Sequence, residues 1–246
     1  MITKIYKDYK ELSAETAMQI AEVIKEKSDA LLCFPAGETS EGTFQELIRL
    51  QENGLTDFSR CKIVGLDEWV HLGKMKSENC YNFLKSRLFD RLPLNPLNMH
   101  FFNGEAEDLE LECRLTDEFI KTNGGIDMML LGVGMNGHLG LNEPGAPSDK
   151  YSHVVDLDNV TKEVGQKYFS ENVKLTRGIT LGLRHIMETG TVIVQLSGKK
   201  KSPVVKRLLE TEPAMDFPVS IVKMHPNAFL LLDSEASQYQ VREAFK

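Results

Sequence analysis

The stretch Ile126-Asp127-Met128-Met129-Leu130-Leu131-Gly132-Val133-Gly134 decides the fold. Its apolar part is short and unbroken, and it stops at glycine instead of alternating with polar residues. Such a run is typical of a strand that is buried on both faces, as in a parallel sheet covered by helices. Four more runs of this kind, each followed by glycine or polar residues, span residues 30–34, 62–66, 191–196 and 228–232. The sequence therefore predicts at least five buried strands.

Amphipathic helices are predicted between these strands. The apolar residues that recur at spacings of three and four are Ala17, Ile20, Ala21 and Ile24; Phe44, Leu47 and Ile48; Leu111, Leu115 and Phe119; and Val204, Val205, Leu208 and Leu209. Ser202 is the expected N-cap of the last helix, and Pro203 is its expected first residue. Strand–helix alternation predicts an α/β fold with a doubly wound, mainly parallel sheet and helices on both faces. Without an internal repeat or linker, residues 1–246 are expected to form a single domain.

Composition narrows the classes of function. Lys and Arg number 29 against 36 Asp and Glu, which gives a net charge of −7 and argues against a nucleic-acid partner. No signal core and no apolar run of roughly 18 residues is present, so we expect a cytoplasmic protein without a membrane partner. The scattered Cys33, Cys61, Cys80 and Cys113 are expected to be buried thiols, not metal ligands or disulfides. No dinucleotide or Walker motif occurs, so neither a cofactor nor a metal is expected.

Residues 142–177 depart from the strand–helix rhythm, because they are polar and weakly periodic. Segments of this length are often lids or substrate loops, and we expect a lid here. A surface excursion without a function is the alternative.

Five clusters follow the apolar runs, where ligands bind in open parallel sheets. They are residues 35–40, 67–68, 132–143, 197–201 and Asp233. In the first, Gly37, Thr39 and Ser40 offer N–H groups and hydroxyls to a phosphate at a helix start, although such residues also cap helices. Glu38 counts against a phosphate unless it points away. Lys199, Lys200 and Lys201 begin another helix and need either an anion or solvent. Together the two clusters favour a phosphorylated small molecule.

The other clusters carry proton-transfer groups. At a buried strand's end Asp67 can have a raised pKa and act as a general base, or it can cap the following turn. The loop at residues 132–143 places His138 and Glu143 five residues apart among glycines, as a tuned pair. Neither Ser nor Cys adjoins His138, which disfavours covalent acyl chemistry. A purely structural histidine is the alternative.

Two motifs resemble those of the glucosamine-6-phosphate deaminase family. Leu66-Asp67-Glu68-Trp69, followed by Ser77-Glu78-Asn79-Cys80-Tyr81, resembles the first signature. The pattern Gly132-Val133-Gly134, Gly137-His138 and Asn142-Glu143-Pro144 resembles the second. Three other stretches also fit the family pattern: Asn103-Gly104, Glu112-Cys113-Arg114, and the turn from Ser197-Gly198 to Lys201. The related 6-phosphogluconolactonases share the Gly-His core but usually carry a different ending, with Phe-Pro in place of Asn-Glu-Pro.

The resemblance implies an aldose–ketose isomerisation of glucosamine 6-phosphate, coupled to release of ammonia. By position it makes Asp67 the enolising base and His138 the ring-opening acid and base, which Glu143 orients. It assigns phosphate and substrate contacts to the turn at residues 37–40, to Gly137 and to Lys201. An arginine of the family's lid aligns with Lys167, which keeps the charge but loses the bidentate fork.

Two departures from the family pattern lie in this site. Asn136 stands where the family has Asp, which weakens the electrostatic support for a protonated imidazole. Glu38 stands where a small residue is usual. These changes make a shifted substrate, such as galactosamine 6-phosphate, credible.

Two further classes of function compete with the deaminase. A sugar-phosphate lactonase is disfavoured by the Asn-Glu-Pro ending, and a non-catalytic sugar-phosphate-binding module remains open because of Asn136. Family members activated by an N-acetylated sugar phosphate hold its phosphate with serines and basic residues. At the corresponding positions this chain has Ala146, Pro147, His153 and Val155. We therefore expect no activation by an N-acetylated sugar phosphate, whether or not the chain forms a homo-oligomer.

Overall fold

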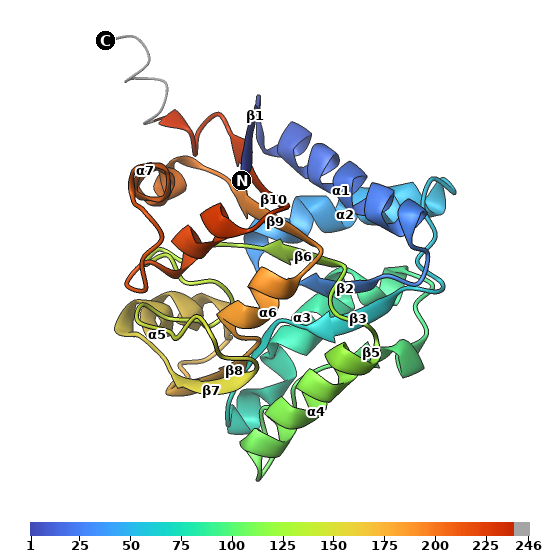
Figure 1. Ribbon diagram of the computed structural model, residues 1–246. Coiled ribbons are helices and arrows are strands. Elements are labelled where there is room, and N and C mark those ends of the chain that lie inside the picture. The colour runs from blue at the N-terminus through green and yellow to red at the C-terminus, as the bar shows by residue number, and fades with distance from the viewer. Residues whose placement is uncertain (239–246) are drawn as a thin grey trace.

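Seven parallel strands form the centre of the molecule in the computed structural model (Figure 1). The structure describes residues 1–238, and for Lys74 and Met75 it describes only the backbone. In spatial order the strands are β1 (Ile2–Tyr6), β10 (Ala228–Asp233), β9 (Thr191–Leu196), β6 (Met128–Leu131), β2 (Leu31–Phe34), β3 (Lys62–Gly65) and β5 (Met99–His100). The five strands predicted from apolar runs are all present, and every pairing in this sheet is parallel. The predicted mainly parallel sheet is confirmed.

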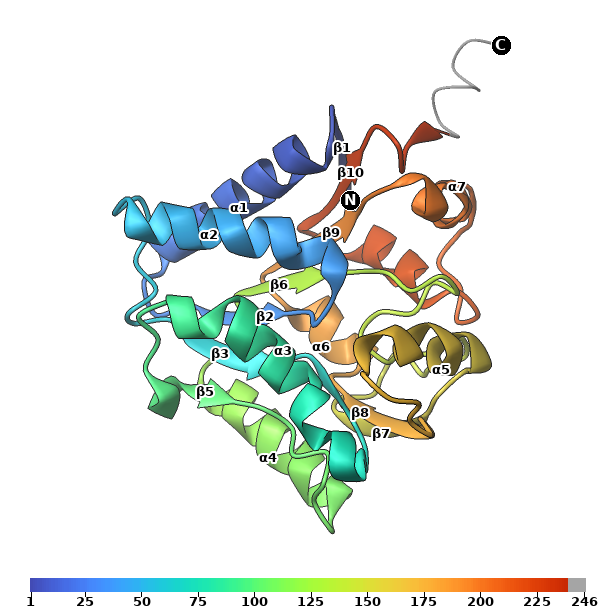
Figure 2. The same cartoon turned by 180° about the vertical axis from the view of Figure 1, so that it is seen from behind.

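Helices cover both faces of the sheet. On one face lie α1 (Tyr9–Glu26), α2 (Glu41–Glu52) and α3 (Cys80–Arg87), which Figure 2 shows in front. The other face carries α4 (Leu109–Thr122), α6 (Leu183–Glu188) and α7 (Ser202–Glu210), which are in front in Figure 1. Consecutive strand residues point to opposite faces, so Cys33 packs in one core and Phe34 in the other. All four cysteines are free and buried, as predicted.

Two helical predictions were wrong in detail. Leu111 and Leu115 are 43% and 47% exposed, because α4 turns a different row toward the sheet. That row contains the buried Leu109, Cys113 and Ile120, and also Thr116, whose hydroxyl lies 2.9 Å from His100 Nε2 on β5. At α7 the N-cap is Lys201, because the Ser202 hydroxyl instead donates to the Glu235 carbonyl at 2.8 Å.

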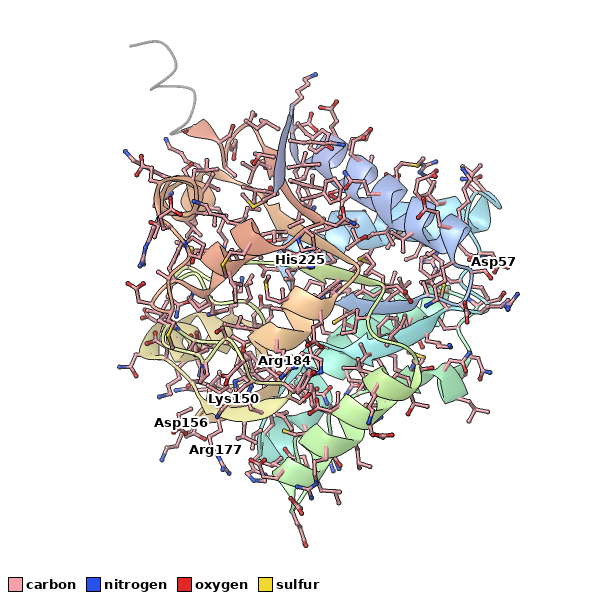
Figure 3. All side chains as sticks on the ribbon, viewed as in Figure 1. Asp57, Lys150, Asp156, Arg177, Arg184 and His225 are labelled. Atoms are coloured by element: carbon pink, nitrogen blue, oxygen red, sulfur yellow. The ribbon has the colours of Figure 1, made fainter. Side chains whose placement is uncertain are left out.

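A second, antiparallel sheet stands beside the first. It consists of β4 (Asp67–Trp69), β8 (Arg177–Thr180) and β7 (His153–Asp156). Asp156 and Arg177, partners in the β7–β8 ladder, lie close together at the outer side of this sheet (Figure 3). Residues 142–177 contain β7, α5 (Asn159–Gly165) and the 3-10 turn η5 (Gln166–Tyr168). These elements are short and differ in type, which explains the weak periodicity of the segment.

The order of the strands predicts where a ligand binds. From β2 the chain continues outward to β3 and β5, and it then returns to the other side of β2 as β6. Ligands bind at such a switch point, outside the carboxyl ends of the strands. The turn after β2 and the glycine-rich loop after β6 therefore face one crevice. None of the helices within residues 1–238 combines the length and apolar character that a membrane span requires.

Candidate active site

Asp67 is the first residue of β4, just beyond the end of β3, and is partly buried. Burial, and to a lesser degree the neighbouring Glu68 carboxylate, raise the pKa of Asp67 to about 7. The side chain lies against the loop after β6, since a Cβ on Gly140 would stand 3.4 Å from Asp67 Oδ2. Near neutral pH this carboxylate therefore can accept a proton and still exist substantially in its ionised form.

One role that the sequence left open for Asp67 was to cap the turn after its strand. The capping contacts are made by Glu68 instead. Its side chain accepts backbone N–H groups from Trp69 at 2.8 Å, Cys80 at 3.0 Å and Tyr81 at 3.1 Å. Cys80 and Tyr81 begin α3, whose free N–H groups attract a carboxylate. Glu68 thus joins β4 to α3 and leaves Asp67 free for chemistry.

The loop after β6 holds His138 by close packing. A Cβ on Gly134 would stand 2.3 Å from the ring carbon Cε1 and 2.5 Å from Nδ1 and Nε2, so only glycine fits beneath this ring. The loop is closed by hydrogen bonds from Gly134 N to His138 O at 3.1 Å and from Gly137 N to Gly134 O at 3.1 Å. The imidazole is therefore held against the backbone.

Glu143 lies beside His138, so the structure brings together the pair predicted from the sequence. Its Oε2 is 3.4 Å from His138 Nδ1 and accepts Asn136 Nδ2 at 2.9 Å. Its Oε1 accepts the Asp158 N–H at 3.1 Å. Burial acts to raise the pKa of Glu143, but bonds from His138, Thr161 and Asn136 outweigh it and lower the pKa to about 2. The side-chain amide oxygen of Asn136 also accepts the His138 backbone N–H at 3.2 Å.

Thr161 is a neighbour of His138 that the sequence analysis missed. Its hydroxyl lies 3.1 Å from His138 Nδ1, and the residue is only 4% exposed. It belongs to α5, more than twenty positions along the chain from the imidazole. A threonine in a polar, weakly periodic stretch gives no local signal of such a contact.

The turn after β2 leads into a helix, as the sequence predicts. Gly37 precedes the 3-10 turn η1 (Glu38–Ser40), which leads directly into α2. Behind it, the Tyr9 hydroxyl donates to Thr39 O at 3.0 Å and accepts Gly42 N–H at 2.8 Å. Tyr9 therefore fixes the turn from the side of α1.

Two lysines approach this turn. Of the three consecutive lysines only Lys201 is drawn inward, and its ammonium donates to the Val133 carbonyl in the His138 loop. Burial, with a smaller contribution from Lys167, lowers the pKa of Lys201 to about 8. Lys167 of η5 pairs with Glu38 at 2.8 Å. The Glu38 charge is thus paired with a cation, for which an incoming phosphate would have to compete.

Asp233 belongs to the support of the site. It is 3% exposed, accepts the Gly198 N–H at 3.0 Å and the Ser197 hydroxyl, and so holds the loop that leads to Lys201. Within residues 1–238, no three His, Cys, Asp or Glu side chains are grouped so that they could hold a metal ion.

Comparison with known proteins assigns the family. The family model of glucosamine-6-phosphate isomerases/6-phosphogluconolactonase matches residues 7–231. The glucosamine-6-phosphate deaminase of Bacillus pumilus is 39% identical over 94% of this chain and 96% of its own. Glucosamine-6-phosphate deaminase 1 of Bacillus subtilis is 36% identical over 93% and 95%.

Solved structures agree with this assignment. A monomeric glucosamine-6-phosphate deaminase superposes with a TM-score of 0.93 at 34% identity, covering 97% of this chain and 99% of that one. The 6-phosphogluconolactonase of Trypanosoma brucei, at 20% identity, 97% and 98% coverage and a TM-score of 0.73, shares the fold. The chain belongs to the glucosamine-6-phosphate isomerase/6-phosphogluconolactonase family.

Proposed function

We propose that this protein is a glucosamine-6-phosphate deaminase that converts glucosamine 6-phosphate to fructose 6-phosphate and ammonia. The observation that carries the proposal is a carboxyl group with a pKa of about 7, Asp67, lying against the loop that holds the His138–Glu143 pair. An isomerase needs such a base, whereas a lactonase needs only an activated water. The similarity to deaminases over nearly the whole chain supports the same reaction.

Ring opening is assigned to His138. The imidazole takes the proton of the anomeric hydroxyl and returns a proton to the ring oxygen, so the cyclic sugar becomes an open-chain aldehyde. The imidazolium that forms is stabilised by Glu143, whose low pKa keeps it ionised at the pH of the reaction.

Proton transfer between carbons is assigned to Asp67. The carboxylate takes the C2 proton of the open-chain sugar and delivers it to C1. A proton also moves from the amino group to O1, so C1 becomes a CH2OH group and C2 becomes an imine carbon. Addition of water to C2 then expels ammonia and leaves the ketone. The raised pKa suits both halves of the transfer, because the group must accept a proton and release it.

The phosphate is assigned to the turn at residues 37–40 and to Lys201, with Lys167 approaching from η5. The N–H groups at the start of α2 and the two ammonium groups supply the donors and positive charge that a phosphate requires. Lys167 belongs to the segment at residues 142–177, which we propose acts as a lid over the bound sugar phosphate. Because phosphorylated sugars do not cross bilayers freely, we place the reaction in the cytoplasm.

An ammonia-coupled assay tests the proposal. We expect ammonia release from glucosamine 6-phosphate or from its C4 epimer galactosamine 6-phosphate, and the ratio of kcat/KM values identifies the preferred sugar. Hydrolysis of 6-phosphogluconolactone without ammonia release from either amino sugar would assign the protein to the lactonases. Tight binding of both amino sugars without turnover would make it a binding module.

A further inference from the structure

We propose that Thr161 is a positioning residue for His138, whose hydroxyl keeps the imidazole proton on Nδ1 and leaves Nε2 free to exchange protons with the sugar. The inference rests on the proposed function, because it assumes that His138 handles the substrate's protons. It adds a residue from α5 to a site that is otherwise built from the ends of the strands.

The distances define a connected group of three side chains. Thr161 Oγ1 lies 3.1 Å from His138 Nδ1, and Glu143 Oε2 lies 3.4 Å from the same nitrogen. The hydroxyl also lies near enough to the Glu143 carboxylate to help lower its pKa. The hydroxyl is the nearer partner, so the carboxylate acts on the imidazole partly through Thr161.

Hydrogen-bond chemistry fixes the direction of these contacts. An ionised carboxylate only accepts, so the Thr161 hydroxyl is the donor toward Glu143, and Nδ1, 3.4 Å from Glu143 Oε2, also faces an acceptor. The hydroxyl oxygen then accepts, and the group facing it must be Nδ1–H. In a neutral imidazole the other nitrogen, Nε2, is therefore unprotonated. Among the described residues Nε2 has no hydrogen-bond partner, as a group that faces substrate requires.

The same helix is attached to Glu143 at a second point. The backbone N–H of Asp158, the N-cap of α5, donates to Glu143 Oε1 at 3.1 Å. One turn later Thr161 reaches His138, and η5 then carries Lys167 to the phosphate turn. Docking of α5 thus completes the surroundings of the imidazole and brings a cation to the phosphate turn in one step.

The chain offers a matched control for the experiment. Thr116 is also fully buried, and its hydroxyl lies 2.9 Å from a ring nitrogen of His100, away from the site. Thr161→Val and Thr116→Val therefore remove the same hydroxyl–imidazole contact at two places. Thr161→Ser keeps the hydroxyl and serves as the rescue variant. Each protein is assayed for kcat and KM, and each is labelled with ¹⁵N-histidine for NMR, with His138→Gln assigning the His138 signals.

We expect Thr161→Val to lower kcat by about tenfold while KM changes by less than about threefold, because the hydroxyl acts on a proton carrier. Thr161→Ser should recover kcat to within about threefold of the parent, and Thr116→Val should leave it unchanged. In NMR the parent should show the proton of His138 on Nδ1, and Thr161→Val should shift it toward Nε2.

Three results would overturn the inference. They are an unchanged tautomer in Thr161→Val, an Nε2–H tautomer in the parent, or equal loss of kcat in the Val and Ser variants. The NMR experiment needs no substrate, so it decides the role of Thr161 even if no amino sugar is turned over. Absence of ammonia release by the parent, in contrast, contradicts the proposed function alone.

Discussion

Asp67 and Glu68 are adjacent carboxylates with different surroundings. Glu68 is 2% exposed and accepts three backbone N–H groups, which oppose the effect of burial on its pKa. Within residues 1–238, Asp67 accepts no backbone N–H group, and burial raises its pKa to about 7. The chain thus uses one acid for structure and leaves the other as a proton acceptor, a difference that the sequence Asp-Glu does not reveal.

The first prediction follows for Asp67→Asn. The amide cannot take the C2 proton, so we expect kcat to fall by about 10²–10⁴. Affinity for inorganic phosphate should change by less than a few-fold, because Asp67 lies outside the phosphate turn. Ammonia release and calorimetry measure the two quantities. Turnover close to that of the parent would remove Asp67 from its assigned role.

The second prediction concerns pH. Asp67 acts as a base only when ionised, so kcat/KM should rise with pH through about 7. Stability should change in the opposite direction. The folded protein keeps this proton between the ordinary Asp pKa of 3.8 and about 7, while the unfolded chain has lost it, so stability falls across this window as pH rises. Urea unfolding should show that Asp67→Asn gains more stability relative to the parent at pH 8 than at pH 5. An equal effect at both pH values would contradict the raised pKa.

At the scale of elements, α3 depends on Glu68. In Glu68→Gln one carboxylate oxygen becomes an NH₂ group, which cannot accept the N–H bonds that begin the helix. A buried donor left without a partner costs about 1–3 kcal/mol, which urea unfolding measures. Glu112→Gln is the control, because the side chain of this partly exposed glutamate accepts one N–H among the described residues, from Asn103. Loss of the Glu68 charge should also lower the pKa of Asp67 and move the acidic limb of the rate profile to lower pH.

The contact between η1 and η5 yields a prediction for phosphate. Glu38 forms an ion pair with Lys167 at 2.8 Å, so an incoming phosphate competes with a carboxylate for this cation. Glu38→Gln should therefore strengthen binding of inorganic phosphate by a few-fold, as measured by calorimetry at low salt; the pair is exposed, which keeps the effect small. Glu46→Gln, which loses its pair with Arg49 at 2.7 Å further along α2, should leave binding unchanged. Weaker binding in Glu38→Gln would mean that Glu38 helps to hold the anion.

The elements also show what the sequence could predict. Strands such as β6 and β9 were predicted because short, unbroken apolar runs that end at glycine or polar residues are typical of buried strands. The three strands of the small sheet were missed, since β4 has three residues and pairs with β8, more than a hundred positions away. The buried side of α4 was misjudged because the sequence offers two apolar rows, and the row that faces the sheet contains Leu109, Cys113 and Ile120 together with Thr116. Thr161 could not be found because its partner lies on a distant loop.

For the whole molecule we predict kinetics without an activator. Ala146 is buried, and His153 is held in place, its Nδ1 lying 2.9 Å from Tyr151 O while burial lowers its pKa. A neutral, already bonded imidazole and an alanine cannot bind a phosphate strongly. The substrate curve should be hyperbolic, and N-acetylglucosamine 6-phosphate should not change it in a steady-state assay. A sigmoidal curve that this compound makes hyperbolic would contradict the prediction.

The pairing of β1 with β10 has a consequence for biosynthesis. These strands lie near opposite ends of the sequence, yet they are neighbours at the edge of the sheet. On the ribosome β1 emerges long before its partner exists, and Ile2 and Ile5, about half exposed even in the folded protein, have nothing to pair with meanwhile. The nascent chain therefore carries an unpaired apolar strand through most of its translation. A chaperone that binds such segments would act on residues 2–6 until β10 has been made.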